Sequence, residues 1–472
     1  MISERLQRFK YIAGDFVMSN IAWFGYNCLR YQFNVFKGTY HTLGDWLSAP
    51  MVFMGQLLFP LLMMAVYYLS GYYNEVFRKS RLHEFVTTLW SSVINSFIIF
   101  FIALINDVAW HRSLNYEMIF LLIVILFSCV YIVRMGITAI SSHHIKNRRW
   151  SFNTLIVGRG KAAVDFGRQL DGMKHSLGYK IMGYVEIPDE KEDKNAPQPR
   201  YSFDEIENVC VQQGIQELIV VPTNKDTDKV LNTINRLFAL NLPIKVTPGN
   251  LHILPSQTRI SDMVGTPLVD ISRGNMSEGG KNMKRLIDVV VSAIMLVILS
   301  PVFLIVSLLV KLDSKGPVLY TQERVGYHNK PFRIIKFRSM VRDAETVGSP
   351  QLSSDSDPRI TRIGRVLRKF RIDELPQFWN VLRGDMSLVG PRPERQYYID
   401  KIIERVPSYA LLRQVRPGIT SLGMVKFGYA QNVDEMVERL NYDLIYLENM
   451  SLLNDFKIMV YTVKIVLTGR GM

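Results

Sequence analysis

The pattern of hydrophobic positions divides this chain of 472 residues into segments of different kinds. Four apolar segments fill the first 140 residues, at about 11–29, 50–72, 85–105 and 116–140. Each can cross a hydrocarbon core of ~30 Å as a helix that rises ~1.5 Å per residue. Nine Lys and Arg residues lie before the first segment, between the second and third, and after the fourth, whereas the two other connecting loops carry only three. Since positive charge favours the cytoplasmic side, both ends of the bundle are expected to be cytoplasmic. The sequence therefore predicts a four-helix transmembrane bundle over residues 1–148.

An acidic residue, Asp15, interrupts the first of these apolar segments. Ionisable residues inside membrane segments are costly, and they are retained either for function or because a partner neutralises them. Two interpretations follow: a functional intramembrane acid, or an interior acid paired near the interface. The paired acid is the favoured one.

Residues 149–272 change to short apolar runs that alternate with helical stretches. The runs at 153–158, 181–186, 217–222 and 243–247 predict strands of a parallel sheet in a Rossmann-like α/β domain, and the polar tract 188–199 predicts an exposed loop. Gly158 and Gly160 form a GxGxxA turn between a strand and a helix, where a dinucleotide can bind, and Glu186 follows at a position that can meet a ribose. A structural turn without phosphate is the competing, slightly favoured interpretation.

A fifth apolar segment runs from 286 to 310, with Ser300 and Pro301 near its middle. Proline removes a backbone donor and clashes with the preceding turn, so the helix is expected to break there, and the serine can satisfy a freed backbone group. Basic residues at both ends give the segment no direction. A helix hairpin that enters and leaves one leaflet, over about 283–311, competes with a kinked full span. A short apolar stretch at 455–467 either lies at the interface or packs on the protein.

Composition supports a membrane protein with an anionic partner. Hydrophobic residues make up 48% of the chain, the mean hydropathy is +0.09, and the net charge is +14, of which half falls within 321–371. Such a basic region is either a solvated face or a binding surface for phosphates and lipid. No nucleic-acid motif accompanies it, so nucleic acid is excluded as the expected partner. The three cysteines are far apart and indicate neither a disulfide framework nor a zinc site.

Within the C-terminal part, Asp373 and Glu374 are the candidate reacting groups. Pro376 is tolerated only in the first turn of a helix, which places the acids near a helix start, where backbone N–H groups favour a phosphate. Neighbours on a helix point about 100° apart, so the two carboxylates are expected to have different roles. Arg368 and Arg371 would keep a carboxylate ionised, as a nucleophile or metal ligand requires. The competing interpretation is a helix-capping acid paired with surface arginines.

Other cations accompany this pair along the chain. Strand-like alternation at 332–340 predicts that Lys336 and Arg338 lie on one face. The stiff turn Pro391, Arg392 and Pro393 presents an arginine suited to a bidentate phosphate contact. Any one of these signals is weak because most arginines are solvated.

Taken in order, these motifs resemble the bacterial sugar transferase family, the polyprenyl-phosphate sugar-1-phosphate transferases. The resemblance covers about 281–472, and its blocks are Lys336 to Met340, Asp357 to Thr361, Arg368, Ile372 to Gln377, Asn380 to Leu382, Gly384 to Glu394 and Arg416 to Thr420. The spans and α/β domain upstream resemble the large members of the family. The expected fold is thus a multidomain membrane protein with a four-helix bundle, a Rossmann-like domain and a mainly helical catalytic domain with a re-entrant hairpin.

The resemblance implies transfer of a sugar-1-phosphate from a UDP-sugar to undecaprenyl phosphate at the cytoplasmic face of the bacterial inner membrane, the first membrane step of surface polysaccharide synthesis. It implies Asp373 as nucleophile and metal ligand, Glu374 as its helper, and Mg²⁺, with Mn²⁺ as an alternative. It also implies a re-entrant break at Ser300 and Pro301. The residues it assigns to substrate binding are Lys336, Arg338, Arg368, Pro391, Arg392, Pro393, Glu394 and Arg416.

The chain departs from the common family pattern at 421–428, which leaves the choice of sugar open. Two alternative functions compete with this one: a membrane-anchored nucleotide-sugar dehydratase, for which Tyr397 and Lys401 have the required spacing, and a non-enzymatic scaffold that senses nucleotide through 151–270. The transferase motifs favour neither. A homodimer through the α/β domain or the spans is left open.

Overall fold

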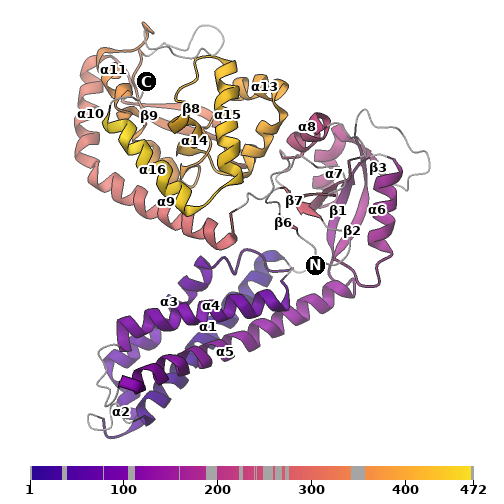
Figure 1. The fold of residues 1–472 in the computed structure, drawn as a ribbon, viewed down its shortest axis with the longest axis vertical. Coiled ribbons are helices and arrows are strands. Elements are labelled where there is room, and N and C mark those ends of the chain that lie inside the picture. Colours follow the sequence, from indigo (N-terminus) through magenta and orange to yellow (C-terminus); the bar gives the residue numbers. More distant parts are fainter. Residues whose placement is uncertain are drawn as a thin grey trace. The chain divides into compact units, whose positions relative to one another are not determined.

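The structure is a computed structural model in which the chain folds into two compact units (Figure 1). The first unit comprises Met1–Ser151, Met173–Gly178 and Ser277–Met283, and the second comprises Phe152–Gly172, Tyr179–Met276 and Lys284–Met472. The structure describes residues 3–33, 40–77, 79–104, 112–158, 160–187, 199–222, 227–238, 240, 242–247, 259–260, 268–271, 276–341 and 357–468.

The first unit is built from long helices: α1 (Glu4–Gln32), α2 (Leu43–Ser48), α3 (Pro50–Leu69), α4 (Arg81–Ile99), which continues into a π-helical turn (Phe100–Leu104), and α5 (Arg112–Lys146). Helices α3, α4 and α5 are long and apolar enough to cross a membrane, judged by length and composition. They coincide with three of the four predicted spans. The remaining predicted span, 11–29, lies within α1 and is helical as expected. By length and composition, however, α1 is not among the helices apolar enough to cross a membrane.

The polar inner face of α1 explains this difference. Gln7, Asp15, Ser19 and Asn27 recur at intervals of four or eight residues, and all four are buried against the other helices. Residues four apart share one face of a helix, so the polar side chains gather on the side that faces the unit's interior. The hydropathy of α1 is therefore low although the helix is long.

Asp15 is a paired interior acid, as the favoured interpretation predicts. Both oxygens of its carboxylate accept hydrogen bonds from Arg134 on α5, at 2.9 and 2.7 Å. The Tyr73 hydroxyl donates a third hydrogen bond at 2.7 Å. Asp15 and Arg134 are 1% and 0% exposed, so the pair neutralises two charges that would otherwise be buried alone.

The α/β part of the second unit contains a seven-stranded sheet in the order β3-β2-β1-β4-β5-β7-β6. Strands β1 to β5 pair in parallel, whereas β5–β7 and β7–β6 pair antiparallel. Helices on its connections give a Rossmann-like arrangement. The bounds are β1 (Phe152–Val157), α6 (Lys161–Asp171), β2 (Tyr179–Glu186), β3 (Arg200–Ser202), α7 (Ile206–Gln212), β4 (Glu217–Val220), α8 (Thr227–Phe238), β5 (Ile244–Val246), β6 (Arg259–Ile260) and β7 (Val269–Asp270).

The four predicted strands correspond to β1, β2, β4 and β5, so the parallel sheet is confirmed. Strands β3, β6 and β7 were not predicted. β6 and β7 have two residues each, too few to show alternation, and β3, of three residues, directly follows the predicted polar loop. The predicted polar loop at 188–199 falls, except for Pro199, outside the described residues.

The transferase part is a mixture of helices and short strands. Its elements are α9 (Glu278–Ile298), α10 (Ser300–Asp313), β8 (Leu319–Val325), β9 (Pro331–Phe337), α11 (Arg362–Lys369), α12 (Gln377–Arg383), β10 (Ser387–Val389), α13 (Gln396–Arg405), the 3₁₀ segment η6 (Pro407–Gln414), β11 (Gly418–Thr420), α14 (Leu422–Lys426), α15 (Val433–Glu448) and α16 (Leu452–Leu467). β8 pairs with β9 antiparallel, and β10 pairs with β11 in parallel.

The predicted helix break is confirmed at Ser300 and Pro301. Helix α9 ends at Ile298, α10 begins at Ser300, and the two are bent by 61°. The Ser300 hydroxyl donates to the Val297 carbonyl at 2.8 Å, so the serine satisfies a local backbone group as expected. A bend of this size fits both a broken span and a re-entrant hairpin.

Candidate active site

The two candidate carboxylates lie on one turn between two helices. Asp373 and Glu374 belong to a 3₁₀ turn, η5 (Ile372–Glu374), which connects α11 to α12. Arg371, directly before it, has the left-handed backbone conformation (φ 57°), which a residue with a side chain adopts only when its surroundings enforce it. Both carboxylates are buried, with 7% and 5% of each residue exposed.

Glu374 is surrounded by three cations, one from its own turn and two from other parts of the chain. Lys336 on β9 lies 2.6 Å from its Oε1, Arg371 lies 3.3 Å from Oε2, and Arg392 lies 3.5 Å from Oε1. Burial by itself would raise the pKa of Glu374, but the charges of Lys336, Arg392 and Arg371 outweigh it and hold that pKa well below its ordinary value. Glu374 is therefore ionised throughout the neutral range.

Asp373 has the opposite surroundings. Among the described residues, its carboxylate makes no hydrogen bond and no ion pair within 4 Å. Burial and the neighbouring negative charge of Glu374 raise its pKa to about 6, against the lowering influence of Lys336 and Arg368. It is thus a buried carboxylate with unengaged oxygens in a positive field. Such a group can attack a phosphorus atom or bind a cation.

Packing of β9 on α12 places Lys336. The side chain of Asn380 on α12 accepts from the Ile335 backbone at 3.0 Å and donates to the Arg333 carbonyl at 2.8 Å. These two hydrogen bonds hold β9 in one register against α12, the helix that follows Glu374. Since side chains alternate along a strand, the register of β9 directs Lys336 to the carboxylate turn.

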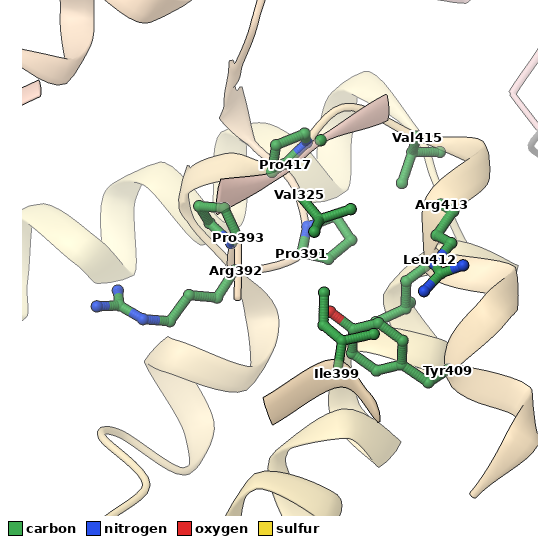
Figure 2. A pocket seen from close by; sticks show the side chains of 11 residues that line it. Val325, Pro391, Arg392, Pro393, Ile399, Tyr409, Leu412, Arg413, Val415 and Pro417 are labelled. Atoms are coloured by element: carbon green, nitrogen blue, oxygen red, sulfur yellow. The ribbon is translucent and has the colours of Figure 1, made fainter. Parts of the chain in front are cut away.

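A rigid turn after β10 places Arg392. Figure 2 shows Arg392 directed away from the other side chains of a pocket that includes Pro391, Pro393 and Tyr409. Its guanidinium group lies near Glu374 instead. The two prolines restrict the backbone on both sides of Arg392, which limits the loss of entropy when the side chain is held in one place.

Glu394 stabilises this turn and does not belong to the carboxylate cluster. It is 5% exposed and forms a short ion pair with Arg439 on α15. A second ion pair joins it to Arg324 at 3.5 Å, and Arg324 also donates to the Pro393 carbonyl. Glu394, which was expected to bind substrate, therefore stabilises the Pro391–Arg392–Pro393 turn in this structure.

Two other predicted substrate-binding residues also lie apart from Asp373 and Glu374. Arg338 donates to the carbonyls of Val310 and Ser314, at the end of α10. Arg416 donates to the Gly384 carbonyl at 3.0 Å. The structure thus brings Lys336, Arg368 and Arg392 to the acids and directs Arg338 and Arg416 to backbone groups elsewhere.

The glycines of the α/β domain have a structural explanation. A Cβ atom on Gly158 would lie 2.5 Å from the carbonyl oxygen of Val221, so the adjacent chain leaves room only for glycine. Gly160 has φ 86°, in the left-handed region, and caps the start of α6. Glu186 lies 3.9 Å from Arg200 on the neighbouring strand. These contacts support the structural-turn interpretation; bound nucleotide stays a hypothesis.

One residue of the cluster was missed from the sequence. The Tyr429 hydroxyl donates to Glu374 Oε1 at 3.3 Å and accepts from Arg371 at 2.6 Å. No periodicity connects Tyr429 to the acids, since it lies 55 residues further along the chain. The one available signal was its place directly after the segment that departs from the common family pattern.

Comparisons with known proteins agree with these motifs. The profile of the family described as "Bacterial sugar transferase" matches residues 280–469. The chain is 45% identical over 188 residues to a UDP-N-acetylgalactosamine-undecaprenyl-phosphate N-acetylgalactosaminephosphotransferase of Aeromonas hydrophila, which covers 40% of this chain and 44% of the relative. It is 33% identical over 251 residues to a UDP-glucose:undecaprenyl-phosphate glucose-1-phosphate transferase of Klebsiella pneumoniae, covering 53% of this chain and 54% of the relative.

A shorter relative is matched over most of its length. A UDP-glucose:undecaprenyl-phosphate glucose-1-phosphate transferase of Caulobacter vibrioides is 43% identical over 189 residues, which is 39% of this chain and 70% of that protein. The chain belongs to the bacterial sugar transferase family. Its matched parts span about half the length of the first two relatives.

Proposed function

We propose that the protein transfers a sugar-1-phosphate from a UDP-sugar to undecaprenyl phosphate and releases UMP. The observation that carries the proposal is the contrast between the two adjacent acids. Glu374 is neutralised by three cations, whereas Asp373 keeps its oxygens unengaged in the same positive field. The names of the relatives support the two substrate classes.

In the first step, a carboxylate oxygen of Asp373 attacks the phosphorus atom that bears the sugar. A bond forms between that oxygen and phosphorus, and the bond from phosphorus to the bridging oxygen breaks. UMP leaves with the bridging oxygen. Lys336, Arg368 and Arg392 supply positive charge around the diphosphate, where negative charge develops as the bridging bond breaks.

In the second step, a phosphate oxygen of undecaprenyl phosphate attacks the same phosphorus atom. The bond between phosphorus and the Asp373 oxygen breaks, and the carboxylate is restored. The product is undecaprenyl-diphospho-sugar. One nucleophile thus serves a water-soluble donor and a lipid acceptor in turn, which requires a site open to both.

Mg²⁺, or Mn²⁺ in its place, fits this site through Asp373. Within the described part of the chain, no group of three or more His, Cys, Asp or Glu is arranged to hold a metal. Mg²⁺ is commonly bound by one or two carboxylates together with substrate phosphates and water, so a single free carboxylate is sufficient. When bound, the ion would neutralise charge on the diphosphate.

The cytoplasmic leaflet of the bacterial inner membrane is the proposed location. A hairpin of α9 and α10 that returns to its own side is compatible with their 61° bend, and it would keep the transferase part in the compartment that holds UDP-sugars. The charge at the ends of the predicted spans supports a location of the α/β domain on the same side. Family membership favours the transferase over the dehydratase and the scaffold.

UMP release by the purified full-length protein tests the proposal. Wild type and Asp373→Asn are incubated with Mg²⁺, undecaprenyl phosphate and a panel of UDP-sugars that includes UDP-glucose and UDP-N-acetylgalactosamine. Asp434→Asn is the matched control, because Asp434 is exposed on α15 and pairs only with Arg405 among the described residues. The proposal predicts turnover for wild type and the control and none for Asp373→Asn. Undiminished UMP release by Asp373→Asn would contradict the proposed function.

A further inference from the structure

We propose that Tyr429 is a positioning residue of this site, one that ties Arg371 to Glu374 through its hydroxyl and holds Arg371 and Arg392 against its ring at the place where the donor's diphosphate binds. The inference rests on the proposed function and extends it to a residue that the family motifs do not include. It also assigns a role to the segment at 421–428, where this chain departs from the common pattern.

The segment before Tyr429 is anchored at its start. Ser421 caps α14 by accepting from the Met424 backbone at 3.0 Å, and Asp443 on α15 accepts from the Gly423 backbone at 2.9 Å. Gly428 then turns the chain with φ 97°, a left-handed conformation. Within the described part of the chain, and apart from its chain neighbours, no atom lies within 4 Å of the position of a Cβ on Gly428, so the backbone conformation, not space, calls for glycine there. The turn delivers Tyr429 to the acidic pair.

The hydroxyl of Tyr429 links two charged groups without adding a charge. It accepts a hydrogen bond from Arg371 Nη1 at 2.6 Å, which leaves its proton directed to Glu374 Oε1 at 3.3 Å. Arg371 also contacts the other oxygen of Glu374 at 3.3 Å. Glu374 is therefore held by a closed arrangement of arginine, tyrosine and carboxylate. Arg371, the residue in the left-handed conformation, is fixed by the same contacts.

The ring of Tyr429 interacts with two guanidinium groups. The Arg371 guanidinium carbon lies 4.1 Å from the ring centroid, and that of Arg392 lies 4.8 Å from it. The electron-rich face of an aromatic ring attracts cations, and more strongly where water is excluded. Two like charges that would repel each other are thus kept in place by one neutral group. Arg392 is thereby available to the diphosphate while it still pairs with Glu374.

The two parts of the side chain should affect different kinetic constants. Loss of the hydroxyl alone loosens Glu374 and Arg371 beside the nucleophile, which acts on kcat. Loss of the ring also releases Arg392, which acts on the KM for the donor. A residue that only filled space would lower the amount of folded enzyme without separating these constants.

Steady-state kinetics of Tyr429→Phe and Tyr429→Leu test the proposal in the full-length protein. We expect Tyr429→Phe to lose about 10-fold in kcat with the donor KM within about twofold, and Tyr429→Leu to show in addition a donor KM raised about 10-fold. Tyr397→Phe is the matched control, because Tyr397 is exposed on α13 and its hydroxyl accepts from Lys401. Thermal unfolding should be similar for all variants.

Equilibrium binding of UMP and of the UDP-sugar separates this proposal from the proposed function. We expect Tyr429→Leu to bind both about 10-fold more weakly than wild type, and Tyr429→Phe to bind them as wild type does. Equal kinetics and binding in wild type and Tyr429→Leu would overturn the role of Tyr429 while leaving the transferase reaction intact. Failure of the wild type to bind any UDP-sugar would overturn both.

Discussion

Asp373 and Glu374 are neighbours in the chain, and their surroundings separate them chemically. Three cations hold the pKa of Glu374 low, and the resulting negative charge helps burial to raise the pKa of Asp373 to about 6. One acid is thus a fixed anion that organises Lys336, Arg371 and Arg392. The other stays available for bond formation, and a carboxylate with a raised pKa is also more nucleophilic when ionised.

The pH dependence of kcat/KM follows from the raised pKa of Asp373. The nucleophile must be ionised, so activity should rise with pH through a midpoint near 6 and fall about tenfold per pH unit below it. The measurement is kcat/KM for the UDP-sugar between pH 5 and 8. A profile that stays flat down to pH 5 would contradict the assignment of Asp373 as the titrating nucleophile.

Replacement of Glu374 by Gln should move this midpoint. The substitution removes the negative charge that raises the pKa of Asp373 and leaves three cations unbalanced, so that pKa falls and the acid limb shifts to lower pH. UMP release should decrease by at least about tenfold, because Lys336 and Arg392 can then pair with the nucleophile. Glu438→Gln, at an exposed position on α15, is the control. A midpoint that moves to higher pH would contradict this account.

At the scale of elements, the site depends on how short segments are fixed to one another. Asn380 joins β9 to α12 through two hydrogen bonds, and Glu394 joins the Pro391–Pro393 turn to α15 through its ion pair with Arg439. Asn380 and Glu394 both lie within a family motif, yet among the described residues neither forms a hydrogen bond or ion pair with Asp373 or Glu374. Motif residues therefore divide into those that meet the substrate and those that hold the segments in register.

The break between α9 and α10 makes a prediction about topology. If the hairpin is re-entrant, its two ends lie on one side of the membrane. Cysteines introduced at Ser277 and Lys315, in a chain with Cys28, Cys129 and Cys210 replaced, should both react with a membrane-impermeant maleimide in inside-out vesicles and not in intact cells. Labelling of the two positions from opposite sides would show that the bent pair is one broken span.

The buried pair between α1 and α5 makes a prediction about stability. Asp15→Leu leaves the Arg134 guanidinium group buried without its acid, which should cost about 3–5 kcal/mol of folding free energy. The thermal unfolding midpoint in detergent should fall clearly, and the double replacement Asp15→Leu/Arg134→Met should recover part of the loss. Glu4→Gln, which breaks an exposed pair with Arg8, is the control and should change little. An unchanged midpoint for Asp15→Leu would contradict the pairing.

At the scale of the whole molecule, the sequence predicted those features that depend on periodicity or on ordered motifs. Three of the spans, four of the five parallel strands, the break at Ser300 and Pro301 and the approach of Lys336 and Arg392 to the acids all follow from such patterns. The burial of the polar face of α1 was not predictable from its length, because Gln7 and Asp15 find their partners on α5 only in the folded unit.

The placements that were not predicted have a common physical origin. Lys336 and Arg338 were assigned to one face by strand alternation, but β9 ends at Phe337, so the alternation no longer directs Arg338. Arg416 and Tyr429 come to their places through turns whose geometry is set by tertiary contacts. Residues brought together by chain segments far apart in sequence cannot be paired by local patterns.

The mass of the intact protein after reaction with a UDP-sugar in the absence of undecaprenyl phosphate tests the central claim most directly. The account predicts an added mass equal to one sugar-phosphate, located by proteolysis on the peptide that contains Asp373, lost when undecaprenyl phosphate is supplied and absent from Asp373→Asn. If wild type turns over both substrates and no adduct forms, or if the adduct lies on another residue, Asp373 is not the nucleophile of a two-step transfer.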